Sequence, residues 1–196
     1  MNRRNLLKLA GGALLAGGSV GAAALLPANA ASTQASSPPA PSAPIPLPRE
    51  VRQLSFINTH TGERFADAYW EAGNYIPDAM AAIDQVMRDH RSGEVHPIDP
   101  ALMDQLHTLR GLVEASAPYQ IISGYRSPAS NAALRAHSNG VASRSLHMDG
   151  KAIDIRIGGT DLTRLRDAAL SMQAGGVGYY AASDFIHVDT GRVRRW

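Results

Sequence analysis

The stretch Ser145-Leu-His-Met-Asp-Gly-Lys-Ala-Ile-Asp154 leads from an aperiodic segment into a predicted β-strand over residues 152–157. Apolar side chains at 153, 155 and 157 would share one face of that strand, because successive side chains alternate between faces. Asp154 then points to the other face. Gly150 lets the chain turn sharply, so His147 and Asp154 can converge on one point. The stretch therefore predicts a polar site on one face of a sheet.

A second predicted strand, residues 185–189, carries His187. Ile186 and Val188 share one of its faces, and His187 lies on the other. If this strand pairs with residues 152–157, His187 and Asp154 project from the same face. Two imidazoles and one carboxylate are a typical catalytic zinc set, which leaves a fourth position open for a water of near-neutral pKa.

A zinc-activated water needs a proton acceptor, and two aspartates compete for that role. Asp184 lies three residues before His187 and could pass the proton to the leaving amine. Asp189 shares a strand face with His187. The spacing alone leaves both open.

Helical and strand patterns surround this pair of strands. Asp99-Pro100 and Ser127-Pro128 are typical helix starts. Predicted helices come mostly first and strands cluster late, which indicates an α+β single domain with a small, mainly antiparallel sheet and helices packed on it. Periodicity places further strands near 52–58, 63–65, 119–123 and 176–180, helices over 76–90, 99–115, 127–137 and 162–172, and a loop over 139–150.

The first thirty residues are typical of an export signal. Arg3-Arg4 and Lys8 precede an Ala/Gly/Leu-rich run, and Ala28 and Ala30 fit a signal peptidase, so we predict a signal peptide over 1–30 that is cleaved after Ala30. A permanent membrane anchor is the alternative, but the run is short and glycine-rich for a span. The paired arginines resemble a twin-arginine signal, so the expected partner in export is the twin-arginine translocase and the destination is the periplasm.

Residues 31–48, ASTQASSPPAPSAPIPLP, are uncharged and rich in Pro, Ala and Ser, which predicts an extended linker. Residues 49–196 then form one domain of ordinary size. The net charge of the chain is +2, and the predicted signal peptide supplies more than all of it, so nothing indicates nucleic-acid binding.

Two catalytic classes are excluded by composition. The chain has no cysteine, which removes thiol nucleophiles and Cys-ligated metals. Its only lysines, Lys8 and Lys151, have no serine three residues before them, so the Ser-x-x-Lys arrangement of serine-type penicillin-binding enzymes is absent.

The pattern Ser-x-His-x-x-Gly-x-Ala-x-Asp, followed by an acidic residue, two residues and His, resembles the D-Ala-D-Ala peptidase family of zinc enzymes, which share the hedgehog/D,D-peptidase fold. The segment Ser123-Gly-Tyr-Arg126 is also similar to one in that family. The resemblance covers nearly all of residues 50–196 and favours the murein endopeptidase branch. The matching positions are Ser145, His147, Gly150, Ala152, Asp154, Asp184 and His187.

The resemblance implies one zinc ion per chain, held by His147, Asp154 and His187. It implies that Arg126 stabilises the oxyanion, a task suited to a permanently charged guanidinium with several donors. Asp184 would be the base, although many family members have the longer Glu there. We expect substrate contacts from Tyr125 and His60, and from Ser145 either a substrate contact or a brace for a metal ligand.

The implied function is a zinc-dependent murein endopeptidase that cuts peptide cross-links of peptidoglycan. Three alternatives stay open: a D,D- or an L,D-carboxypeptidase that trims stem peptides, and a non-catalytic wall-binding module of the same fold. Peptidoglycan is the expected partner, and we expect a monomer. The bond that is cut and the native metal stay open, since His, His and Asp would also accept Co, Ni or Mn.

Overall fold

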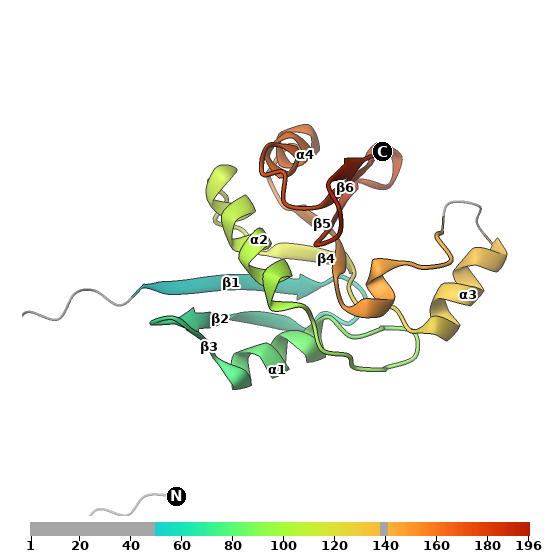
Figure 1. The fold of residues 1–196 in the computed structure, drawn as a ribbon, viewed down its shortest axis with the longest axis horizontal. Helices are drawn as coiled ribbons and strands as arrows, with labels where there is room; N and C mark the ends of the chain where they lie inside the picture. The colour runs from blue at the N-terminus through green and yellow to red at the C-terminus, as the bar shows by residue number, and fades with distance from the viewer. Residues whose placement is uncertain (1–49, 138–140) are drawn as a thin grey trace, which may run out of the picture. The chain divides into compact units, whose positions relative to one another are not determined.

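The computed structural model describes residues 50–137 and 141–196, so the predicted signal peptide and linker lie outside the described residues. Within this part, no helix combines the length and the apolar character that a membrane span requires. The strands are β1 (Val51–Asn58), β2 (Arg64–Glu71), β3 (Asn74–Tyr75), β4 (Tyr119–Ser123), β5 (Ala152–Ile157), β6 (Gly176–Tyr180), β7 (Phe185–Asp189) and β8 (Arg194–Arg195); the helices are α1 (Pro77–Val86), α2 (Pro100–Leu112), α3 (Pro128–His137) and α4 (Leu162–Ser171), with 3-10 turns at Leu146–Asp149 and Ala181–Ser183 (Figure 1).

The strands of the described residues form one sheet in the order β3-β2-β1-β4-β5-β7-β6-β8. Neighbours are antiparallel except for the parallel pairs β1–β4 and β6–β8. The predicted α+β fold with a mainly antiparallel sheet is therefore confirmed. The two edge strands, β3 and β8, were not predicted from the sequence. Each is only two residues long, which is too short to show a periodic pattern.

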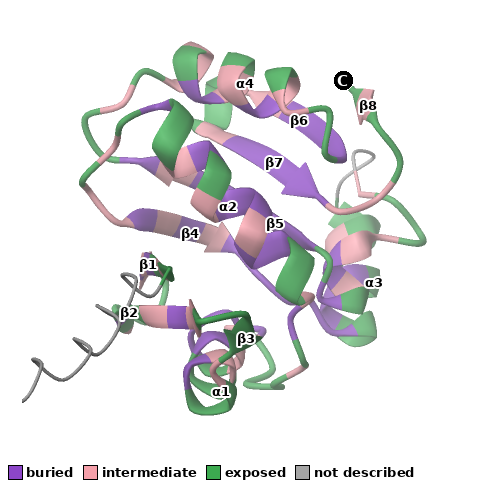
Figure 2. Ribbon diagram, turned by 60° about the vertical axis from the view of Figure 1, so that its left-hand side comes forward, coloured by how far each residue is buried: buried purple, intermediate pink, exposed green. Residues whose placement is uncertain are grey.

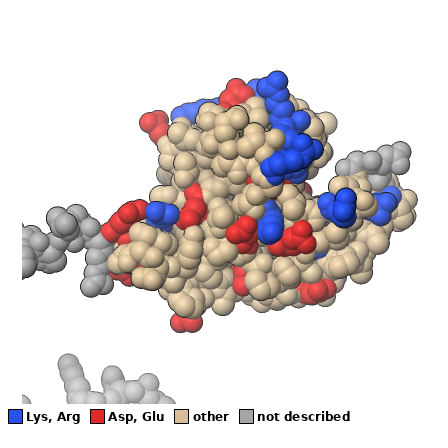
Figure 3. Space-filling model, viewed as in Figure 1, with Lys and Arg blue, Asp and Glu red and all other residues tan. Residues whose placement is uncertain are grey.

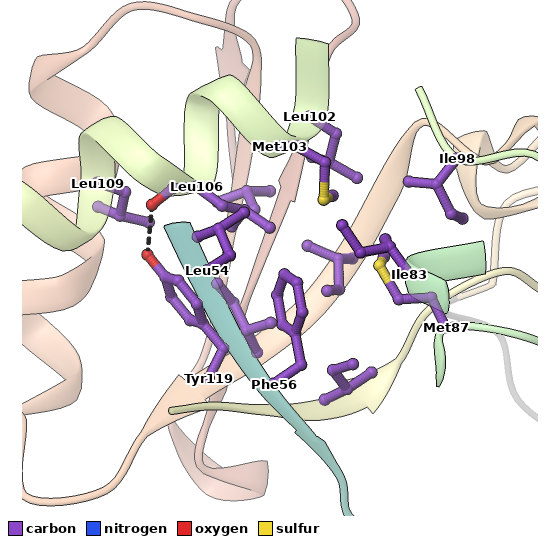
Figure 4. Packing of buried hydrophobic residues seen from close by; sticks show 14 of the residues in the cluster. Leu54, Phe56, Ile83, Met87, Ile98, Leu102, Met103, Leu106, Leu109 and Tyr119 are labelled. Carbon is purple, nitrogen blue, oxygen red and sulfur yellow. Dashed lines mark hydrogen bonds between the residues drawn. The ribbon is translucent and has the colours of Figure 1, made fainter. Parts of the chain in front are cut away.

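The apolar face of the sheet is covered by α1, α2 and α4. Helix α2 begins where predicted, since the Asp99 carboxylate accepts a hydrogen bond from the Ala101 N–H at 3.0 Å and Pro100 follows. Figure 4 shows its apolar side chains facing Leu54 and Phe56 of β1, and the Tyr119 hydroxyl of β4 donating to the Leu106 carbonyl at 2.8 Å. Four apolar residues along this helix and at its C-terminal end are all buried: Leu102, Leu106, Leu109 and Val113.

Several predicted bounds were wrong. The strand expected near 63–65 runs to Glu71, and the helix expected over 99–115 ends at Leu112. The helix expected over 76–90 ends at Val86, because its last carbonyl groups bond elsewhere. The Val86 carbonyl accepts from the Asn58 side chain at 2.9 Å, and the Met87 carbonyl accepts from the Tyr125 N–H at 2.8 Å. The expected loop over 139–150 contains a 3-10 turn, which is capped by Ser145 and closed by Gly150 at φ 65°.

Candidate metal centre

The site forms where β5 and β7 pair. The two strands are antiparallel with Asp154 directly opposite His187, so the pairing on which the predicted site depends is present. The 3-10 turn before β5 brings His147 to the same point. All three side chains are buried, and their closest atoms are 2.9 Å (His187 Nδ1 to Asp154 Oδ1), 3.2 Å (His147 Nε2 to His187 Nδ1) and 3.3 Å (His147 Nε2 to Asp154 Oδ1) apart.

The neighbours of each imidazole determine which ring nitrogen faces the centre. His147 Nδ1 lies 2.7 Å from the Gly124 carbonyl, which can only accept, so Nδ1 carries the proton and Nε2 is left with its lone pair. His187 Nε2 lies 2.9 Å from Asp189 Oδ2, so the opposite tautomer is favoured and Nδ1 faces the centre. Such outer contacts are typical of metal-binding histidines.

The donor set fits a divalent metal. Tetrahedral zinc ligands bound at about 2.0–2.1 Å are about 3.3 Å from one another. The three separations, 2.9 to 3.3 Å, come close to that value. These residues form the one cluster of potential metal ligands found among the described residues. Two nitrogens and one carboxylate oxygen suit zinc and related first-row metals.

Asp154 is held in its charged form. Burial alone would raise its pKa, but without a metal the charge of a protonated His147 and hydrogen bonds from the protonated forms of both imidazoles outweigh burial and hold the pKa of Asp154 below its usual range. A metal bound between these atoms would take the place of those protons. The Arg126 guanidinium adds a further positive charge, with Nη2 3.6 Å from Asp154 Oδ2. Asp154 is therefore a charged carboxylate, ready to act as a ligand, even before a metal binds.

Arg126 is positioned rigidly beside this centre. Its Nη2 donates to Ser123 Oγ at 3.3 Å and its Nη1 to Asn131 Oδ1 at 3.4 Å. Its backbone N–H donates to the His147 carbonyl at 3.1 Å. The Arg126 Nε is buried and finds no acceptor among the described residues. The guanidinium thus retains donor capacity next to the three potential ligands.

A cleft of about 460 Å³ opens over the centre. Ser145 lines it, as do three arginines, Arg126, Arg144 and Arg194. Figure 3 shows Lys and Arg side chains gathered on one face near α4 and the last strands. The complete lining is Arg126, Val141, Ala142, Arg144, Ser145, Leu146, His147, Asp154, Tyr180, Phe185, His187, Arg194 and Trp196.

The other predicted contact residues lie outside this lining. The Tyr125 hydroxyl donates to Glu94 Oε1 at 2.9 Å. His60 Nε2 lies 3.0 Å from the Ile122 carbonyl, and its ring stacks on His90. Asp184 also lies outside, since its carboxylate accepts from Arg156 Nη1 at 2.9 Å and its side chain is 66% exposed.

Asp189, the competing base, is fully buried and fully bonded. Its Oδ1 accepts from the N–H groups of Gly176 and Gly191 and from Arg194, and its Oδ2 accepts from His187 and Arg194. These contacts leave no oxygen for a water molecule. The alternation of residues 185–189 placed Asp189 correctly beside His187, but nothing in the sequence indicated Arg194 or Trp196, which reach the site through β8.

Comparison with known proteins gives two consistent findings. The family model described as peptidoglycan L,D-endopeptidase MepK matches residues 47–196. Peptidoglycan L,D-endopeptidase MepK of Escherichia coli (strain K12) is 44% identical over 195 residues, which cover 100% of this chain and 97% of that protein. Probable peptidoglycan L,D-endopeptidase MepK of Haemophilus influenzae is 44% identical over 146 residues, 74% of this chain and 78% of that protein.

Proposed function

This chain belongs to the family of peptidoglycan L,D-endopeptidase MepK, and from that membership and its metal centre we propose that it is a zinc-dependent hydrolase of peptide cross-links in peptidoglycan. The resemblance seen in the sequence is thereby confirmed at the level of the family. The observation that carries the zinc proposal is the convergence of His147 Nε2, His187 Nδ1 and Asp154 Oδ1, with both tautomers favoured by outer contacts. When bound there, zinc supplies Lewis acidity for peptide-bond hydrolysis.

Each residue near the centre then has a distinct task. His147, Asp154 and His187 hold the metal. Arg126 donates hydrogen bonds to the oxyanion that develops on the scissile carbonyl, and its contacts with Ser123 and Asn131 keep it in place for that purpose.

Asp184 is the proposed proton acceptor. Asp189 is disfavoured for this role because all of its oxygen contacts are already made within the protein. Asp184 is exposed, and Arg156 is its one side-chain partner among the described residues, so the proposed role requires the carboxylate to turn from Arg156 towards the cleft. Asp184→Asn should therefore lower kcat while zinc affinity is kept.

The cleft suits an anionic peptide. Arg126 and Arg194 are engaged by carboxylates of the protein itself. Arg144 lines the same cleft and has no ion-pair or hydrogen-bond partner among the described residues, so it is available to a substrate carboxylate. Ser145, next to Arg144 in the chain, lines the same cleft and offers a further polar contact.

The relatives are named L,D-endopeptidases. A bond between two diaminopimelate residues joins an L centre to a D centre, whereas a bond from D-Ala to diaminopimelate joins two D centres. We therefore propose the diaminopimelate–diaminopimelate bond as the substrate. Action on peptidoglycan places the protein outside the cytoplasm; the periplasm, export by the twin-arginine translocase, cleavage after Ala30 and a monomeric state belong to the same proposal.

The deciding experiment incubates residues 31–196 with purified sacculi, with and without chelator, and identifies soluble muropeptides by mass spectrometry. Loss of cross-linked dimers that chelator and His147→Ala both abolish is the expected result. Loss of terminal alanine alone would instead identify a carboxypeptidase. Intact sacculi, despite one bound zinc per chain, would make the protein a wall-binding module.

A further inference from the structure

Arg194 holds the carboxylate that orients one of the potential metal ligands. Its Nη1 donates to Asp189 Oδ1 at 3.0 Å and its Nη2 to Asp189 Oδ2 at 2.7 Å. Two parallel bonds between planar groups fix the rotation of the carboxylate as well as its position, which a single point charge cannot do. Asp189 Oδ2 in turn lies 2.9 Å from His187 Nε2.

The position of Arg194 depends on the last strand. Strand β8 pairs parallel to β6 with Gly176 opposite Arg194, and this pairing places the guanidinium over Asp189. Trp196 extends the same segment, and its backbone N–H donates to the Val177 carbonyl at 3.2 Å. Its indole ring lies 5.3 Å from the His187 ring and 4.9 Å from the Arg194 guanidinium carbon. The segment therefore contacts His187 through the Trp196 indole and Asp189 through the Arg194 guanidinium.

Three glycines leave the space that this arrangement occupies. A Cβ on Gly176 would collide with both Asp189 Oδ2 and the Arg194 guanidinium. A Cβ on Gly175 would collide with the Asp189 backbone carbonyl, and one on Gly191 would lie 3.0 Å from Asp189 Oδ1. Distances this short are not tolerated without movement of the neighbouring atoms, so the surroundings are shaped around the Arg194–Asp189 pair.

We propose that Arg194 is a positioning residue of the metal centre, which acts on His187 through Asp189. The bidentate pair keeps Asp189 Oδ2 directed at His187 Nε2, and this contact keeps the proton on Nε2 and the Nδ1 lone pair on the metal side. The proposal rests on the proposed metal-dependent function. It concerns the ligand geometry and assigns Arg194 no contact with the reacting atoms.

The test compares the full chain with three variants: Arg194→Gln, Arg194→Lys and, as matched control, Arg195→Gln. Arg195 is the exposed neighbour on the same strand and does not line the cleft over the metal centre. Zinc affinity is measured by competition with a chromophoric chelator, and the unfolding temperature of each metal-free protein is recorded. We expect Arg194→Gln to weaken zinc binding by about 10–100-fold, Arg194→Lys to recover part of that loss, and Arg195→Gln to bind as the wild type does.

A second readout follows the imidazole directly. Long-range ¹⁵N spectra of the metal-free proteins at pH 8 distinguish protonated from unprotonated ring nitrogens. The wild type should show His187 Nε2 fully protonated against Asp189, whatever the state of Nδ1 beside Asp154, and Arg194→Gln should show Nε2 only partly protonated. Unchanged zinc affinity together with an unchanged His187 tautomer in Arg194→Gln would overturn the proposal, as would an equal loss of affinity in Arg195→Gln.

The two readouts separate this inference from the function on which it rests. If the wild type itself binds no zinc, the proposed function fails, and the tautomer spectra still decide the role of Arg194. If Arg194→Gln does not fold, Arg194→Lys decides: it keeps the charge but loses the bidentate geometry, and an affinity and tautomer equal to those of the wild type would contradict the proposal.

Discussion

Strands β5 and β7 present two faces that are almost equally buried and chemically opposite. On one face Ile153, Ile155, Ile186 and Val188 are fully buried in the apolar core. On the other face Asp154, His187 and Asp189 are between 0 and 8% exposed, and Figure 2 shows both strands buried along nearly their whole length. Burial therefore does not distinguish the two faces. They differ in the hydrogen bonds that the polar side chains make and in the atoms that those side chains leave free for a ligand.

The largest expected effect comes from changing the polar face at its centre. Asp154→Asn keeps the size of the side chain and removes the negative charge that both imidazoles face. We expect loss of bound zinc and a decrease in kcat/KM of at least about 10³-fold, because metal assistance contributes several kcal/mol to hydrolysis. Bound zinc is measured by elemental analysis and activity by release of muropeptides. Full zinc occupancy with activity within tenfold of wild type would show that Asp154 only braces the imidazoles.

Arg126→Lys tests whether the charge beside the polar face is catalytic. Lysine cannot reach Ser123 and Asn131 together, as the Arg126 guanidinium does. Loss of an aimed oxyanion donor costs about 10²–10³-fold in kcat, so we expect a decrease of that size with zinc affinity nearly unchanged. The measurement is kcat on an isolated cross-linked dimer, with zinc titration as the control. A variant that loses zinc but turns over normally when zinc is in excess would assign Arg126 to the metal instead.

The apolar face should respond only in stability. Ile155→Val removes one buried methylene from the face opposite Asp154. Such a change costs about 0.5–1.5 kcal/mol of unfolding free energy. Denaturant unfolding of the metal-free protein measures this loss, and kcat/KM should stay within about twofold of the wild-type value. A large loss of activity in Ile155→Val would contradict the idea that the apolar face serves stability and the polar face serves catalysis.

The sequence predicted this separation because it depends on local alternation. Residues 152–157 and 185–189 each show which side chains share a face. The sequence left open whether the two strands pair; the structure shows that they do, with Asp154 opposite His187. Helix starts at Asp99 and Pro128 were also predicted, since the capping and proline signals lie within the segment itself.

The parts that escaped prediction depend on contacts between distant segments. Helix α1 ends at Val86 because Asn58 and Tyr125 bond its last carbonyls, and neither residue lies in the helical pattern. Arg194 meets Asp189 only because β8 pairs with β6, and a two-residue strand has no measurable period. The tautomer of His147 depends on the Gly124 carbonyl, a backbone group that no residue type reveals.

The smallest expected effect concerns a third buried carboxylate, Asp89, which can be compared with Asp154 and Asp189 on the polar face. It lies on neither face and accepts hydrogen bonds from the Ser127 N–H at 2.9 Å and the Ser127 hydroxyl at 2.7 Å, next to Arg126. Burial would raise the pKa of Asp89, but hydrogen bonds from Ser130, Ser127 and the backbone outweigh burial and hold that pKa well below its usual range.

A carboxylate whose pKa is lower in the folded state than in the unfolded state, where it is about 3.9, stabilises the fold at pH values above 3.9. This stabilisation is lost as the pH falls from there towards the pKa of the folded state. Between pH 7 and pH 4 the loss from one such group is only about 0.3 kcal/mol, and it grows below pH 4. The difference in unfolding free energy between wild type and Asp89→Asn should therefore narrow by that amount over this range, as measured by urea unfolding of the metal-free proteins. A difference that stays constant down to pH 3 would mean that Asp89 braces the Ser127 loop by shape and not by charge, unlike the carboxylate at the centre of the polar face.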